Sequence, residues 1–351
     1  MRKFFAAMVA ALTAAVVVSG CSGAPGSGEK RPPGAAVVVV SGGDAVSPFT
    51  TRDRACATGL AAGNTDTAIR EYLLGKGYTV YTSPAMNGRG QVVDQQGFGA
   101  FGVCPVTLPE NMTVNSTGSI DTAGEHLARF INWLHDEKGV TEVDFVAHSM
   151  GGLYSRAAIR VLATTGSTVK IRSLTTIGTP WQGSYLSDYA NDLIPLSDCR
   201  GDKLCESAMK QFKDRVLQLM AGSGREVNTK FLMGRDGWNE FQSGVLDAIP
   251  VVLIAGTKFT APAPANPAVW PNDGLVAEES ALATSIGDPV LPHRRCYTFD
   301  DTHSIFVSNT AGLEWKTALT WDPQVFEVLH QAIGDAPGAL EGANREGCPA
   351  S

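Results

Sequence analysis

The chain has 351 residues, of which 44% are hydrophobic and 18% are charged. This balance is typical of a globular protein with a substantial core, and it argues against a disordered chain or a protein with many membrane spans. The formal net charge of -7 disfavours nucleic acid as a partner, because binding phosphate groups requires a basic surface.

The first 20 residues have the pattern of an export signal. Arg2 and Lys3 precede an apolar run over residues 4–18, which is too short to span a bilayer as a permanent helix. The run leads into the sequence VSGC, which ends at Cys21 and resembles the lipobox of bacterial lipoproteins. We therefore expect a signal peptide over residues 1–20 and lipidation of Cys21, with an ordinary cleaved signal as the alternative.

A glycine-, serine- and proline-rich segment follows Cys21 over residues 22–33. Such a segment cannot bury enough apolar surface to fold, so residues 21–34 are predicted to form a flexible tether. A lipidated cysteine carries enough acyl chain for stable anchoring. The sequence thus predicts an exported lipoprotein, anchored to the outer face of the bacterial cell membrane or secreted if the anchor is cleaved.

Six of the seven cysteines remain when Cys21 is set aside, and an even number in an exported protein predicts disulfide bonds. Many pairings are possible, and only the short loop between Cys199 and Cys205 is indicated closely by its spacing. A zinc site is the competing interpretation, but no Cys-x-x-Cys pair supports it, and no metal site is predicted. The pairs that we favour are Cys56–Cys104, Cys199–Cys205 and Cys296–Cys348.

Short apolar, β-branched runs of strand length recur along the chain and alternate with helical patterns. The predicted strands cover residues 35–40, 78–81, 143–147, 171–177, 249–255 and 295–298. The predicted helices between them cover residues 67–76, 119–138 and 151–163. Because continuous apolar strands alternate with helices, the sequence predicts an α/β fold with a mostly parallel central sheet and helices on both faces.

Two stretches interrupt this alternation and are long enough to need a structure or a function of their own. Residues 83–116 are rich in glycine, and residues 183–248 contain a helical pattern over 206–220 with Met209 and Phe212 on its apolar side. This helix can pack on the body of the domain or act as a lid over an active site, and both interpretations stay open.

Residues 140–155 read VTEVDFVAHSMGGLYS, an apolar strand that runs into a tight turn and then a helix. This pattern is typical of a nucleophile elbow, where small neighbours allow a sharp turn that lifts the serine hydroxyl out of the backbone. Ala147 and Gly151 are these small neighbours, with alanine at the position where glycine is commoner. Ser149 is therefore the predicted nucleophile.

A serine nucleophile needs an imidazole to take its proton and a carboxylate to orient that imidazole, in the chain order serine, acid, histidine. His303 follows the last predicted strand, whereas His293 precedes it and His330 lies in an apolar helical run. Asp273, in the loop after the strand at 249–255, is the predicted acid, although Asn-Asp-Gly is also ordinary turn chemistry. The acids held in reserve are Asp247, Asp300 and Asp301.

The oxyanion formed during ester cleavage needs two backbone N–H donors that are in place before the reaction begins. Met150, directly after the nucleophile, is predicted to supply one. The loop after the first strand, with Gly42 and Gly43, is predicted to supply the other. Gly43 is the preferred donor and Asp44 the alternative.

Three sequences in this chain resemble those of secreted bacterial triacylglycerol lipases and esterases: AHSMGG at 147–152, IGTPWQG at 177–183 and NDGLV at 272–276. The resemblance covers about residues 37–333 and implies an α/β-hydrolase fold. We expect a single domain over residues 35–351, with residues 183–248 as a possible lid. Such enzymes usually carry His-Gly where this chain has Ser41-Gly42, which leaves the second oxyanion donor less well defined. Some members bind a structural calcium, but its ligands match no positions here, so no cofactor is predicted.

The predicted function is that of a serine carboxylic-ester hydrolase that acts on acyl or lipid esters through an acyl-enzyme. An envelope acyltransferase that uses the same triad is the alternative. A noncatalytic surface binding protein is less favoured, because Ser149, Asp273 and His303 are all present. Acyl-chain length and oligomeric state are not predicted.

Overall fold

The computed structural model describes residues 31–53, 64–92, 106–219, 222–335 and 345–349. Residues 31–351 form one compact unit by themselves. The predicted signal peptide, Cys21 and the predicted pair Cys56–Cys104 lie outside the described residues.

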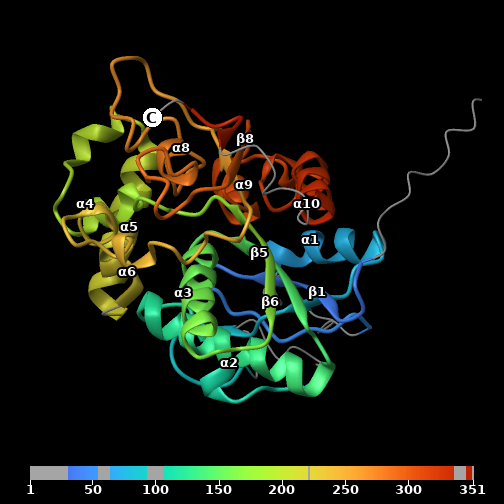
Figure 1. Ribbon diagram of the computed structural model, residues 1–351. Coiled ribbons are helices and arrows are strands. Elements are labelled where there is room, and N and C mark those ends of the chain that lie inside the picture. Colours follow the sequence, from blue (N-terminus) through green and yellow to red (C-terminus); the bar gives the residue numbers. More distant parts are fainter. Residues whose placement is uncertain (1–30, 54–63, 93–105, 220–221, 336–344, 350–351) are drawn as a thin grey trace, which may run out of the picture. The chain divides into compact units, whose positions relative to one another are not determined.

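A seven-stranded sheet with the order β2-β1-β5-β6-β7-β8-β9 lies at the centre of this unit (Figure 1). Every neighbouring pair in it is parallel. Its strands are β1 Ala35–Val40, β2 Val80–Thr82, β5 Glu142–His148, β6 Lys170–Ile177, β7 Val251–Gly256, β8 Arg294–Phe299 and β9 Arg345–Glu346. The short strands β3 Ala85–Met86 and β4 Val114–Asn115 form a separate parallel pair.

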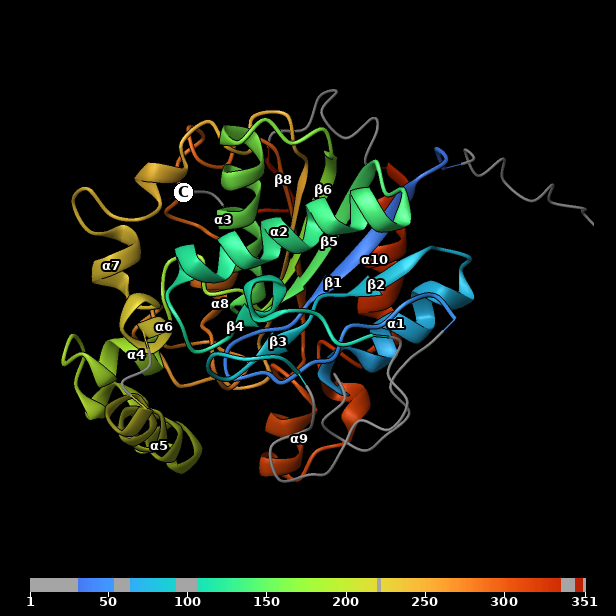
Figure 2. The same ribbon diagram turned by 90° about the horizontal axis from the view of Figure 1, so that it is seen from below.

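Helices cover both faces of the sheet (Figure 2). The helices α2 Ile120–Lys138 and α3 Gly151–Thr164 pack on one face, and α1 Asn64–Gly75 and α10 Pro323–Asp335 pack on the other. Successive side chains of a strand point to opposite faces, so a strand buried on both faces must be apolar throughout. This accounts for the continuous valine run of β1 and confirms the predicted α/β fold.

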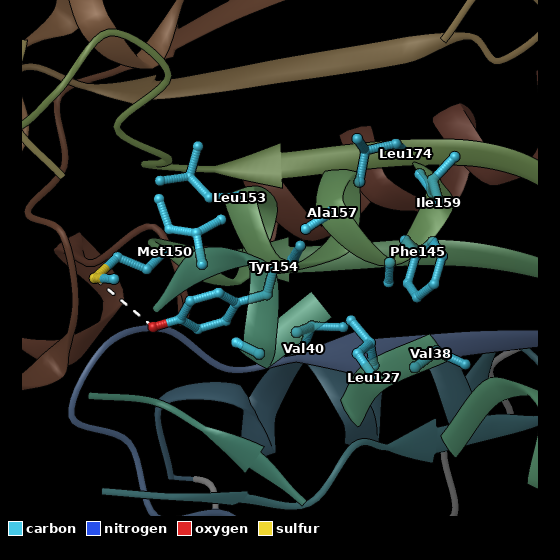
Figure 3. Close-up of a cluster of buried hydrophobic side chains, with 14 of the residues drawn as sticks. Val38, Val40, Leu127, Phe145, Met150, Leu153, Tyr154, Ala157, Ile159 and Leu174 are labelled. Carbon is cyan, nitrogen blue, oxygen red and sulfur yellow. Dashed lines mark hydrogen bonds between the residues drawn. The ribbon is translucent and has the colours of Figure 1, made fainter. Parts of the chain in front are cut away.

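The helix α2 begins and ends where the sequence indicates. Ser119 caps it by accepting a hydrogen bond from Thr122 N at 3.2 Å, and Gly139 ends it in the left-handed conformation at φ 67°. A Cβ on Gly124 would lie 2.3 Å from Ala157 Cβ, so a glycine is needed where α2 crosses α3. Leu127 of α2 belongs to the apolar cluster of this face, which is drawn in Figure 3.

The described residues of the predicted insertion form four α-helices, of which α5 is the longest. The apolar side of α5 packs against α4, and Met209 of α5 is buried in a cluster with Val269 and Trp270. These helices are α4 Tyr185–Ala190, α5 Lys203–Leu219, α6 Gly222–Glu226 and α7 Thr229–Met233. The remaining short elements are α8 Glu278–Ala281, α9 Ile305–Ala311, η1 Glu110–Met112, η2 Leu196–Cys199, η3 Glu240–Gln242 and η4 Trp315–Thr317.

Two disulfide bonds are present in the described part of the chain. Cys199 is bonded to Cys205 and Cys296 to Cys348, which are two of the three predicted pairs. No helix in the described ranges has both the length and the hydropathy needed to cross a membrane.

Candidate active site

Ser149 lies in the sharp turn between β5 and α3, and its backbone is in the left-handed region at φ 56°. Its N–H donates to Ile177 O at 2.8 Å, which ties the turn to the neighbouring strand β6. A Cβ on Gly42 would lie 2.5 Å from Ser149 Cβ, and one on Gly151 would lie 2.5 Å from Val40 O. The turn therefore requires small residues around the serine, as a nucleophile elbow does.

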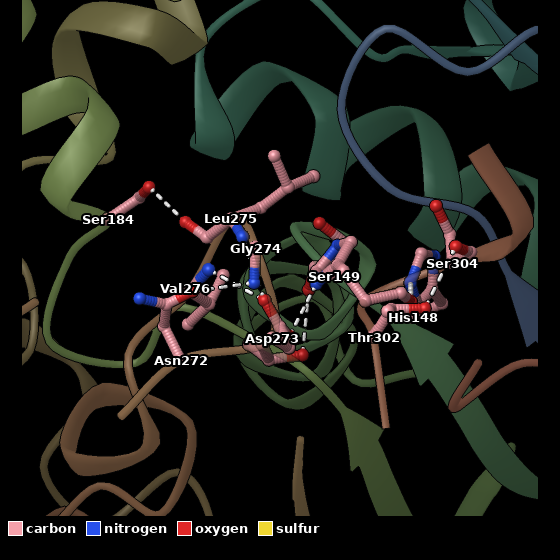
Figure 4. Close-up of polar contacts among 12 residues, drawn as sticks. His148, Ser149, Ser184, Asn272, Asp273, Gly274, Leu275, Val276, Thr302 and Ser304 are labelled. Carbon is pink, nitrogen blue, oxygen red and sulfur yellow. Dashed lines mark hydrogen bonds and ion pairs between the residues drawn. The ribbon is translucent and has the colours of Figure 1, made fainter. Parts of the chain in front are cut away.

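Asp273 and His303 meet across the loops that follow β7 and β8. His303 Nδ1 lies 2.7 Å from Asp273 Oδ2, and both side chains are buried. The other carboxylate oxygen, Oδ1, accepts hydrogen bonds from Leu275 N and Val276 N, at 2.9 and 2.8 Å (Figure 4). A carboxylate fixed in this way holds the imidazole proton on Nδ1, which leaves Nε2 able to accept a proton.

The elbow and the histidine loop are in contact. His148, which precedes the nucleophile, donates from Nε2 to His303 O at 3.0 Å, and the two imidazole rings lie 4.6 Å apart. Burial and the nearby His303 lower the pKa of His148 well below its usual value, so His148 is neutral. Among the described residues no hydrogen bond joins Ser149 Oγ to His303, and in unliganded active sites this bond is often long.

The two predicted oxyanion donors are neighbours in space. A Cβ on Gly43 would lie 2.5 Å from Met150 Sδ. Within the described residues, neither the Gly43 N–H nor the Met150 N–H has an acceptor, whereas the Asp44 N–H donates to Ser116 O at 3.2 Å. The geometry therefore favours Gly43 over Asp44 as the second donor.

Three other candidates considered from sequence, His330, Asp300 and Asp301, have their contacts elsewhere. His330 Nδ1 is hydrogen-bonded to the Tyr78 hydroxyl at 2.6 Å, in agreement with a structural role. Asp300 pairs with Lys258 at 2.9 Å. Asp301 is buried beside Asp322, and this burial and the second carboxylate raise the pKa of Asp301 to about 8.

Sequence reasoning missed residues that support the site through backbone contacts. Thr179 Oγ1 donates to Ser149 O at 2.7 Å. Gly178 leaves room for the acid–histidine pair, because a Cβ there would lie 2.9 Å from His303 Nδ1. Both belong to the IGTPWQG segment, whose sequence alone indicates a resemblance and not these contacts.

An ion pair joins the insertion to the oxyanion loop. Arg215 of α5 donates to Asp44 Oδ1 at 2.7 Å, and Asp44 directly follows Gly43. Both side chains are partly exposed, so the pair contributes little stability by itself. In the described ranges no group of three or more His, Cys, Asp and Glu side chains is arranged to hold a metal ion.

Comparisons with known proteins point to the same chemistry over part of the chain. Residues 103–196, which include Ser149, match the family described as "Putative serine esterase (DUF676)". A 71-residue stretch is 35% identical to triacylglycerol lipases of Pseudarthrobacter phenanthrenivorans and Burkholderia plantarii, and it covers 20% of this chain. Over the matched residues the chain is similar to serine esterases and triacylglycerol lipases. The matched stretch spans 21% and 18% of the two lipases, about a fifth of their length.

Solved structures show a more distant likeness. The Bacillus licheniformis lipase BlEst2 in its propeptide form is 15% identical with a TM-score of 0.47, covering 92% of this chain and 54% of that one. An alpha/beta hydrolase fold protein from Chitinophaga pinensis is 12% identical with a TM-score of 0.46, covering 87% and 90%. The α/β fold is therefore established by the strand order and the parallel pairing within this chain.

Proposed function

We propose that this protein is a carboxylic-ester hydrolase with Ser149 as nucleophile, His303 as general base and acid, and Asp273 as the orienting carboxylate. The observation that carries the proposal is the buried 2.7 Å contact between His303 Nδ1 and Asp273 Oδ2 beside a serine held at φ 56°. A histidine oriented by a carboxylate next to an elbow serine suits acyl transfer through a covalent intermediate.

In the proposed reaction Ser149 Oγ attacks the ester carbonyl carbon while His303 Nε2 takes the hydroxyl proton. The Gly43 and Met150 N–H groups stabilise the resulting oxyanion. The ester C–O bond then breaks, the leaving alcohol takes the proton from Nε2, and an acyl-enzyme remains on Ser149. Water attacks this ester with His303 as base, which releases the acid and returns a proton to Ser149.

The substrates that we propose are acyl or lipid esters, by analogy with the triacylglycerol lipases that share 35% identity over 71 residues. An acyltransferase would follow the same steps up to the acyl-enzyme and differ only in the acceptor, a hydroxyl in place of water. We further propose, from the N-terminal sequence alone, that the protein is exported and anchored through Cys21.

The test uses residues 31–351, which form a compact unit, and p-nitrophenyl esters of increasing chain length. We expect steady-state release of p-nitrophenol, with loss of at least about a thousandfold in kcat in Ser149→Ala. Release that requires an added alcohol and yields a new ester would favour the acyltransferase. A folded chain that cleaves no ester would contradict the proposed hydrolase.

A further inference from the structure

A cavity of about 620 Å³ lies between the end of α4, the helices α6 and α7, and the residues that follow α7. Ser149, Asp273 and His303 are not among the residues that line it. Trp238 is buried in its lining and donates from Nε1 to Asp121 Oδ1 at 2.9 Å. The exposed apolar and basic residues of the lining, here called the basic-aromatic surface, are Leu193, Arg225, Lys230, Phe231, Arg235 and Phe241. Two exposed acids, Asp121 and Asp236, also line the cavity.

Exposed apolar side chains concentrate on this surface. Leu193, Phe231 and Phe241 are 40%, 36% and 64% exposed. In the described part of the chain, three other large apolar side chains are comparably exposed, so half of all such side chains surround one cavity. Clustered apolar exposure of this kind marks an interaction site rather than ordinary surface.

The charges on the basic-aromatic surface are also unbalanced. Arg225, Lys230 and Arg235 form no ion pair with any described residue, and all three are exposed. Asp121 is paired with Arg160 at 2.7 Å, which leaves Asp236 as the uncompensated acid of the lining. Three cations against one anion give a local charge of about +2 on a chain whose formal net charge is -7.

We propose that the basic-aromatic surface docks on an anionic phospholipid surface. Phe231 and Phe241 would enter the boundary between headgroups and acyl chains, and the three cations would contact lipid phosphates. Exposed aromatic side chains beside unpaired cations suit such a surface, since apolar insertion and attraction to anionic headgroups act together. This docking is independent of the proposed ester hydrolysis.

The test measures cosedimentation of residues 31–351 with vesicles of phosphatidylglycerol and of phosphatidylcholine. We expect binding to phosphatidylglycerol that weakens as salt rises, and a loss of at least about tenfold in the triple variant Arg225→Gln, Lys230→Gln, Arg235→Gln. Phe241→Ala should weaken binding without changing the charge.

The matched control is the triple variant Lys170→Gln, Lys203→Gln, Lys316→Gln, which makes the same change in net charge at exposed lysines elsewhere. It should bind vesicles like the parent chain. Equal binding by the two triple variants, or no preference for phosphatidylglycerol, would overturn the proposal. A dimer in solution that both Phe241→Ala and the first triple variant abolish would assign the surface to a second copy instead.

A separate observation concerns the loop that carries Gly43. Behind it, Ser41 Oγ donates to Asp66 Oδ2 of α1 and lies 2.7 Å from Ser47 Oγ. All three side chains are buried, each 2% exposed. A buried chain of two hydroxyls and a carboxylate therefore anchors the start of the oxyanion loop.

Burying the Asp66 carboxylate costs free energy, so packing alone does not explain its presence here. Burial raises the pKa of Asp66 to about 6, although the Ser41 hydrogen bond opposes this rise. Its second oxygen, Oδ1, has no hydrogen-bond partner among the described residues. Buried carboxylates in such surroundings are found preferentially at functional sites.

The loop that Ser41 begins touches the nucleophile directly. A Cβ on Gly42 would lie 3.1 Å from Ser149 Oγ, so a shift of Ser41 would move the backbone beside the reacting atom. We infer that Asp66, acting through Ser41, is a positioning residue that holds the Gly43 N–H toward the developing oxyanion. This role rests on the proposed hydrolase function.

The test compares kcat and KM of Ser41→Ala and Asp66→Asn on a soluble p-nitrophenyl ester. We expect kcat to fall about tenfold to a hundredfold with KM changed less than about twofold, because the oxyanion exists only in the transition state. An alkyl boronic acid, which forms a tetrahedral adduct with the serine, should bind more weakly by a similar factor. The melting temperature of Asp66→Asn at pH 7 should not fall, since its neutral amide avoids the cost of a buried charge.

Ser173→Ala is the matched control, because Ser173 Oγ donates to the buried Asp144 at 2.7 Å near the opposite end of β5. It should leave kcat unchanged. If the parent chain is active and Ser149→Ala is not, kcat within about twofold in both test variants would overturn the positioning role and leave the hydrolase intact. If the parent chain itself cleaves no ester, the result would instead contradict the proposed hydrolase function.

Discussion

The contact between Asp273 and His303 depends on the absence of a side chain at Gly178. Gly178 follows β6 with φ 58°, and a Cβ there would lie 3.0 Å from Asp273 Oδ2 and 2.9 Å from His303 Nδ1. Gly178 also donates its N–H to Ile254 O at 2.8 Å, so its backbone cannot easily move away. The site thus requires glycine at this position for both backbone conformation and space.

We predict that Gly178→Ala lowers kcat at least about tenfold in a chain that still folds, because the methyl group must displace the imidazole or the carboxylate. Steady-state kinetics with a short-chain ester measures this. Gly166→Ala is the control, since Gly166 has φ 70° but its Cβ would meet nothing within 4 Å. If the two variants lose activity equally, backbone strain rather than contact with the pair explains the loss.

Asp301 makes the stability of the folded chain depend on pH. Its pKa is raised to about 8 by burial and by Asp322, so the folded state keeps a proton that the unfolded chain releases near pH 4. The contribution of Asp301 to the free energy of unfolding is therefore complete below about pH 4, and it is lost as the pH rises from there toward 8.

We predict that the melting temperature falls between pH 6 and pH 8, and that Asp322→Asn makes this fall shallower by removing the second carboxylate. Thermal unfolding at several pH values measures both. Asp192→Asn, at an exposed carboxylate, should leave the slope as it is. An unchanged slope in Asp322→Asn would contradict the coupling between the two acids.

The residues of the site differ in how well their roles can be predicted from the sequence. Ser149 is indicated by its local turn, and Asp273 and His303 by their positions after strands in a fixed chain order. Asp66 acts through a contact with Ser41, 25 residues away, that no local pattern signals. Packing between distant segments decides such roles, and it becomes visible only in three dimensions.

At the scale of elements, the two described disulfides tie down different lengths of chain. Cys199–Cys205 closes six residues at the start of α5, whereas Cys296–Cys348 closes 52 residues and joins β8 to the segment after β9. A longer closed loop restricts the unfolded chain more, so the second bond should stabilise the fold more strongly.

We predict that replacing Cys296 and Cys348 by serine costs about 4 kcal/mol, against about 2 kcal/mol for Cys199 and Cys205. Denaturant unfolding of the two double variants measures this difference. Because α5 contacts Asp44 through Arg215, loss of the shorter bond should affect activity more than stability. A larger stability loss from the shorter bond would contradict the ranking.

Strands and long helices were predictable because their apolar periods are long and regular. The strand predicted at 249–255 begins at Val251, since Pro250 has no N–H to donate to the sheet. The short helix α4 of the insertion was not predicted, because its Tyr185 and Leu186 are buried in a cluster with Trp270, which lies far away in the sequence. Whether residues 183–248 move as a lid stays a prediction.

At the scale of the whole molecule, we propose two separate attachments to the membrane: a lipidated Cys21 and the basic-aromatic surface of the compact unit. A lipidated Cys21 would give stable anchoring, and the basic-aromatic surface would add a second, reversible contact with the lipid headgroups. A protein held in this way would meet ester substrates at the lipid surface.

We predict that Cys21→Ser moves the full-length protein expressed in bacteria from the membrane fraction to the soluble fraction, and abolishes incorporation of labelled palmitate. Fractionation followed by immunoblotting measures the first effect. Unchanged fractionation and labelling in Cys21→Ser would contradict the proposed anchor.

Activation of the Ser149 hydroxyl by His303 and Asp273 is tested most directly with a fluorophosphonate probe. Mass spectrometry of labelled residues 31–351 should find one phosphonylated peptide, the one that contains Ser149. His303→Ala should slow the labelling at least about a hundredfold. Labelling at a different serine, or no labelling of a folded chain, would contradict the account.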